Sequence, residues 1–123
     1  MRTINITEEP LFNSLLEIKD LNDFVDLHND FDVNSVSYEA ANEQLKLKLN
    51  SSNKSIELVF DNVEIIEFSI HIQDKTIDNF YRGRYEIRNE LFEEYKDKKC
   101  FYIDFDEGGK INLLCKTAEI III

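Results

Sequence analysis

The chain has few residues that break or crosslink a fold. Its 123 residues include three glycines, one proline, two cysteines and no tryptophan. With so few breaking residues we find no linker, repeat or low-complexity tract, and the sequence predicts one globular domain over residues 1–123. Cys100 and Cys115 belong to no metal-ligand spacing, which favours two free thiols in a reducing cytoplasm, while a disulfide stays open.

Long apolar runs and catalytic motifs are also missing. No stretch of about 18 apolar residues occurs, and the first ten residues lack the apolar segment of a secretory signal, so we expect a cytoplasmic protein that does not enter a membrane. There is no Gly-x-Ser-x-Gly elbow and no phosphate-binding glycine loop. We therefore expect a protein without enzymatic activity or cofactor.

Basic residues are scarce in the first third of the chain. Residues 1–45 hold ten acids and two bases, a net charge of −8 out of −11 for the whole chain. Such a field repels nucleic acid and anionic lipid, and it favours a basic protein partner. Acidity that serves only solubility is the alternative.

Helical patterns appear in two places. Thr7, with the acids and the proline that follow it, is typical of a helix start, and Leu11, Leu15 and Ile18 share one helical face. A second short helical run from Asp20 follows. Residues 85–96 also show helical spacing, so the sequence predicts an N-terminal helix and a helix inserted near 85–96.

The remaining segments alternate with the period of a strand. Leu45, Leu47 and Leu49 alternate with polar residues, and residues 56–60 and 101–105 do so as well. A change of parity at Ile65-Ile66 predicts a bulge, and the uniform run 120–123 predicts a strand inside the sheet. Together with the helices this predicts an α+β domain with a mainly antiparallel sheet of six to seven strands.

Two groups of residues are candidates for a binding site. Carboxylates near a helix-to-strand junction would attract a basic partner, and tyrosine and arginine are enriched in interface hot spots. The candidates are Asp23, Asp26, Asp30 and Asp32 for attraction, and Tyr81, Arg82 and Tyr85 for anchoring. Alternatively, the carboxylates cap and turn the chain, the aromatic residues are core, and the arginines pair with nearby glutamates.

Residues 30–68 carry a further pattern. A polar His/Asp junction precedes Val33-x-x-Val36-x-Tyr38, the alternating leucines, and residues 56–63. This order resembles small acidic bacterial domains, among them immunity proteins of toxin systems. The resemblance implies a protein that neutralises a cognate toxin by binding it and has no activity of its own.

Two other functions stay open from the sequence. One is a structural domain that self-associates, as a homo-oligomer, through a sheet edge or through its isoleucine tail. The other is a small metal-dependent hydrolase that uses His28 and the neighbouring aspartates, since hard cations prefer oxygen ligands.

Overall fold

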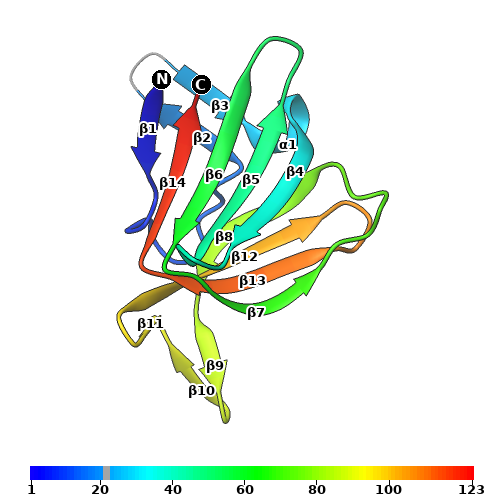
Figure 1. Ribbon diagram of the computed structural model, residues 1–123. Helices are drawn as coiled ribbons and strands as arrows, with labels where there is room; N and C mark the ends of the chain where they lie inside the picture. Colours follow the sequence, from blue (N-terminus) through cyan, green and yellow to red (C-terminus); the bar gives the residue numbers. More distant parts are fainter. Residues whose placement is uncertain (21–22) are drawn as a thin grey trace.

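The computed structural model describes residues 1–20 and 23–123, and of residues 20 and 23 it describes the backbone alone. Two five-stranded antiparallel sheets make up most of the chain (Figure 1). Sheet I has the order β1 (Arg2–Asn5), β14 (Thr117–Ile122), β6 (Ser55–Asp61), β5 (Gln44–Asn50) and β4 (Asp32–Glu39).

Sheet II is built around one long strand, β12 (Lys98–Phe105). On one side of β12 lie β13 (Lys110–Cys115) and then β7 (Glu64–Ser69). On its other side lie β8 (Ile77–Gly83) and the short β11 (Glu94–Tyr95), since β8 and β13 pair with the same residues of β12.

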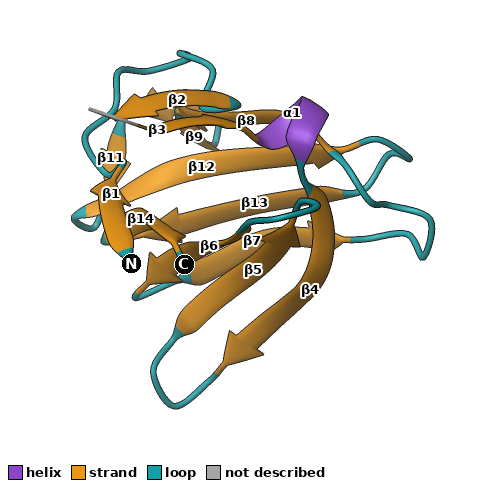
Figure 2. Cartoon of the chain, turned by 90° about the horizontal axis from the view of Figure 1, so that it is seen from above, coloured by secondary structure: helices purple, strands orange, loops and turns teal. Residues whose placement is uncertain are grey.

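Two small hairpins and one helical turn complete the described elements. The hairpins are β2 (Glu17–Asp20) with β3 (Asp23–Asp26), and β9 (Tyr85–Ile87) with β10 (Glu90–Phe92). The β9–β10 hairpin projects away from both sheets (Figure 1), and the helix α1 (Leu27–Asp30) lies beside sheet II (Figure 2). No helix among the described residues is long and apolar enough to cross a membrane.

The core lies between the two sheets. Phe60 of β6 packs against Phe80 of β8 and Phe101 of β12, with ring centroids 6.1 and 5.8 Å away. All three side chains are fully buried. Alternation puts them there, because every second residue of a strand points to the same face. The core therefore joins strands that are far apart in the sequence.

The predicted α+β class is wrong, because the chain is 62% strand and 3% helix. The expected N-terminal helix is absent from the described residues, although Leu15 is buried, as the apolar face of that helix predicted. Instead, this segment runs along the edge of β8, where the amides of Phe12 and Leu15 donate to the carbonyls of Arg82 and Phe80 at 2.8 Å. Leu15 is buried by this contact with β8. The spacing of apolar residues alone cannot distinguish burial by such a tertiary contact from burial on the apolar face of a helix.

The helix predicted near 85–96 is also wrong. The segment forms β9, β10 and β11, with one tight turn between β9 and β10 and another between β11 and β12. Arg88 and Asn89 both have positive φ (50° and 67°), as do Lys96 and Asp97 (52° and 62°). Two consecutive positive φ angles are typical of two-residue hairpin turns, and a helix cannot continue through them.

Several strand predictions are confirmed. Leu113 pairs with Ile65 and Asn112 with Glu67, so Ile66 is the extra residue of a bulge at the predicted place. The isoleucine run lies in β14, between β1 and β6, inside sheet I (Figure 1). Both cysteines are free and buried.

Candidate functional site

An aromatic surface lies on the outer face of sheet II. Along β12, Phe101 and Ile103 point into the core, so Tyr102 points outward. Tyr102 pairs in register with Tyr81 of β8, and their rings stack at 5.2 Å with an interplanar angle of 16°. Both rings are half-buried.

Phe12 and Arg84 extend this surface. The Phe12 ring lies 6.2 Å from that of Tyr81 and is 57% exposed. The guanidinium of Arg84 lies 5.4 Å from the centroid of the Phe12 ring, within the range of a cation–π contact. We call Phe12, Tyr81, Arg84 and Tyr102 the aromatic surface.

The backbone around Gly83 fixes the position of Tyr102. Tyr102 donates from its hydroxyl to the carbonyl oxygen of Arg84 at 2.6 Å. A Cβ added at Gly83 would lie 2.6 Å from Cε2 of the Tyr102 ring, so only glycine leaves room for the ring. Burial raises the pKa of both Tyr81 and Tyr102, which keeps the two hydroxyls neutral at physiological pH.

Arg82 is placed for packing rather than for partner contact. It shares the core side of β8 with Phe80 and is only 8% exposed. Its Nη1 donates to the carbonyl of Glu9 at 3.2 Å, and its Nη2 lies 3.8 Å from Glu94. The contact with Glu9 ties the N-terminal segment to sheet II. Arg84, two residues further along the chain, is exposed instead.

Lys99 also holds the N-terminal segment against sheet II. Its ammonium lies 3.0 Å from Glu8 and 3.4 Å from Glu94. The hydrogen bond that Lys99 donates to Glu8 raises the pKa of Lys99 above its usual value. Glu94 also pairs with Arg82, which is the arginine–glutamate pairing that the alternative predicts.

Tyr85 belongs to a separate cluster on the protruding hairpin. Its ring lies 5.2 Å from that of Tyr95, and the Phe92 ring lies 6.0 Å from Tyr95. These three side chains hold β9 and β10 next to β11. Tyr85 is half-buried and has no ring contact with Tyr81 in the described chain.

The predicted aspartates separate into different roles. Asp26 caps α1 by accepting from the backbone amide of Asn29 at 3.0 Å and from its side-chain amide at 2.8 Å. The bond from the Asn29 backbone lowers the pKa of Asp26. Asp23 lies in β3, and its side chain is outside the described structure.

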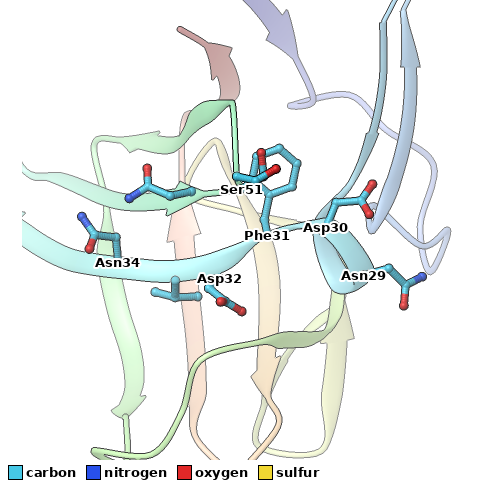
Figure 3. A pocket seen from close by; sticks show the side chains of 9 residues that line it. Asn29, Asp30, Phe31, Asp32, Asn34 and Ser51 are labelled. Atoms are coloured by element: carbon cyan, nitrogen blue, oxygen red, sulfur yellow. The ribbon is translucent and has the colours of Figure 1, made fainter.

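Among the predicted aspartates whose side chains the structure describes, Asp30 and Asp32 face solvent. They line a polar hollow with Asn34 and Ser51, and in Figure 3 their carboxylates point in different directions. Neither forms an ion pair with a described residue. Both are therefore available to a cationic partner.

Strand β8 connects the acidic and the aromatic positions. His28 of α1 lies with its Nδ1 3.0 Å from the carbonyl of Ile77 and 3.3 Å from the carboxylate of Asp78. Asp30 of α1 thus lies near the start of β8, and the aromatic surface lies near its end. Over the described residues, no three histidine, cysteine or carboxylate side chains gather as a metal site would require.

Sequence reasoning missed Phe12, Arg84 and Tyr102 as members of the site. Tyr102 carries a signal, because it alternates with the apolar Phe101 and Ile103 and so must face outward. Phe12 carries none, because its place beside Tyr81 depends on a contact between distant segments. No family model, curated protein or solved structure matches this chain.

Proposed function

We propose that this protein is a non-catalytic binding protein that neutralises a cognate bacterial toxin by direct contact, as immunity proteins do. The observation that carries the proposal is the presence of two surfaces near opposite ends of β8: exposed carboxylates of α1 and β4 near its start, and stacked aromatic rings with an arginine near its end. The resemblance of residues 30–68 to immunity domains supports the same function.

The carboxylates would act on the rate of association. Asp30 and Asp32 are exposed, and the chain carries a net charge of −11. Such a field attracts a basic domain over a distance comparable with the Debye length, about 10 Å at 0.1 M salt. Steering of this kind raises the association rate more than it raises the final affinity.

The aromatic surface would act on the rate of dissociation. Tyr81 and Tyr102 are already held by stacking, and Tyr102 is further held by its bond to Arg84. Little side-chain entropy is then lost on binding. Pre-ordered tyrosines and an arginine are the residue types that dominate interface energies.

The test is binding to the product of the neighbouring open reading frame, in a catalytically inactive form. We expect Tyr81→Ala to speed dissociation by about tenfold or more, in line with hot-spot values near 2 kcal/mol. Tyr38→Ala is the matched control, since Tyr38 is exposed on β4 in the other sheet. Failure of the two proteins to form a complex would contradict the proposal.

The proposed effect of Asp30 and Asp32 on the association rate is tested separately. Asp30→Asn with Asp32→Asn should slow association at low salt, and the difference from the native protein should vanish at about 0.5 M NaCl, where exposed charges are screened. Equal association rates at low and high salt would rule out steering and leave the anchoring role to be judged by Tyr81→Ala.

A further inference from the structure

We propose that the free edge of β7 is a second docking site, which takes an extended segment of a partner protein as an added strand. The segment would carry apolar side chains on one face and basic side chains on the other. This site lies on the opposite edge of sheet II from β8 and does not depend on the toxin-binding proposal.

The edge of β7 is open. In the described chain β7 pairs with β13 alone, so the backbone groups on its other side have no strand partner. All six of its residues are exposed. Unpaired strand edges are templates for the addition of another strand, and peptide-recognition domains use them in this way.

One face of this edge is apolar. Ile65 pairs with Leu113, and Phe68 pairs with Ile111, so both point to the same side as these two core residues. Leu113 and Ile111 are buried, whereas Ile65 and Phe68 are exposed, Phe68 to 48%. Tyr38 of β4 and Val63 line the same hollow as Ile65, and the charged Glu43, Glu64 and Lys98 line it as well.

The other face of the edge is acidic. Glu64 pairs with Leu114 and Glu67 with Asn112, on the outer side of the sheet. Neither glutamate forms an ion pair with a described residue. Lys98 and Lys110 lie nearby, but they belong to strands further inside the sheet.

The register therefore specifies the chemistry of an added strand that passes the bulged Ile66 as β13 does. Its residues opposite Ile65 and Phe68 would be apolar, and its residues opposite Glu64 and Glu67 would be lysine or arginine. Opposite charges directly across an antiparallel pair are stabilising, and like charges there are destabilising.

A second copy of this chain fits the edge poorly. Antiparallel pairing of two β7 strands keeps the faces of the sheet aligned, so four glutamates would meet on the outer side. It would also bring together two chains that each carry a net charge of −11. A partner with basic residues is the occupant that the charges favour.

The test uses synthetic peptides. A labelled seven-residue peptide alternating lysine and valine is titrated with the full chain by fluorescence polarisation at low salt. Its two controls are the same peptide with glutamate for lysine, and the lysine peptide N-methylated at alternate residues. We expect saturable binding of the lysine peptide, binding at least tenfold weaker for both controls, and slowed amide exchange at residues 64–69.

Variants locate the site. Glu67→Lys, an exposed change that should leave the fold intact, is expected to weaken the lysine peptide and strengthen the glutamate peptide. Phe68→Lys should weaken both. Leu91→Lys on β10 is the matched control, because Leu91 is also an exposed apolar residue (59%, against 48% for Phe68) but lies on the protruding hairpin. Circular dichroism confirms that each variant is folded.

Four results would overturn the proposal. They are absence of binding, equal binding of the glutamate peptide, equal binding of the N-methylated peptide, or a peptide-free dimer in sedimentation that Phe68→Lys dissociates. The last result would assign the edge to a second copy. Because no toxin is used, none of these results bears on the proposed function.

Discussion

At the scale of single residues, the site depends on one missing side chain. Gly83 has no Cβ, and an added one would lie within 3 Å of two Tyr102 ring atoms and 3.2 Å from Tyr81. The ring cannot easily retreat, because its hydroxyl is bonded to the Arg84 carbonyl. Gly83 is therefore needed for space rather than for an unusual backbone angle.

The first prediction concerns this glycine. Gly83→Ala should destabilise the protein by about 1–3 kcal/mol, the usual cost of an overpacked site. The measurement is the urea midpoint followed by circular dichroism. Asn79→Ala in the same strand is exposed and should change stability by less than about 0.5 kcal/mol. Equal effects of the two changes would contradict this role.

The second prediction concerns the cap of α1. Asp26→Ala removes both bonds to Asn29 and should cost about 1 kcal/mol at neutral pH. The backbone bond from Asn29 lowers the folded pKa of Asp26 below its ordinary 3.8. The charged carboxylate therefore contributes stability that is fully present above the unfolded pKa and is lost as pH falls through the lower folded value.

The difference in stability between Asp26→Ala and the native protein should accordingly shrink below about pH 4. Urea unfolding between pH 7 and pH 2 measures it. Asp32→Ala is a suitable control, because no described hydrogen bond uses the Asp32 side chain, and it should change little at neutral pH. A difference that grows toward low pH would show that the charged form is not the stabilising one.

At the scale of elements, apolar residues that alternate at every second position predicted strands correctly, whereas apolar residues at the helical spacing of 3.6 did not predict helices correctly. The alternation in β5 arises because one face is fully buried and the other is polar, which only a strand at a sheet surface requires. Leu11, Leu15 and Ile18 match a helix equally well, but in the fold Leu11 lies in a turn, Leu15 in extended chain beside β8, and Ile18 in β2. Spacing alone does not say which distant strand will bury an apolar residue.

The turns explain the other missed element. Residues 85–96 lack the Asn-Gly and Asp-Gly pairs by which hairpins are usually found, although they form turns with two positive φ angles. Arginine, lysine and aspartate hold these angles at a cost. The pairing of the flanking strands evidently outweighs that cost.

The third prediction follows from these turns. Replacing Lys96 by asparagine and Asp97 by glycine supplies the residue types that this turn prefers, and should stabilise the protein by about 1 kcal/mol. The thermal midpoint measures the gain. The matched control places the same pair at Gln73 and Asp74, where neither φ is positive and Asp74 accepts from the His71 amide at 2.8 Å, so stability should fall. A loss of stability at residues 96–97 would contradict the turn geometry.

At the scale of the whole molecule, the sequence predicted which residue types form the site but not how they meet. Tyr81 was identified from composition, and Asp30 and Asp32 from charge. Tyr102 joins Tyr81 only because β8 and β12 pair in one register, and Phe12 joins them because the N-terminal segment follows the edge of β8. Such contacts arise from long-range strand pairing, which no local pattern encodes.

The last prediction concerns the net charge. The chain has 25 acids against 14 bases, and a charge of −11 destabilises the compact state through self-repulsion. The described ion pairs involve few of these acids, so repulsion should outweigh attraction. Raising NaCl from about 10 to 150 mM should therefore stabilise the free protein by about 1 kcal/mol, seen as a rise of about 5 °C in Tm.

A less acidic variant provides the comparison. Changing the exposed residues Glu39, Glu64 and Glu67 to glutamine makes the net charge of the chain less negative, from −11 to −8. This variant should be more stable than the native protein at low salt and should gain less from added NaCl, since screening acts only on the charge that remains. A Tm that falls with salt in the native protein would mean that its few ion pairs, rather than its excess of carboxylates, dominate the electrostatic free energy of folding.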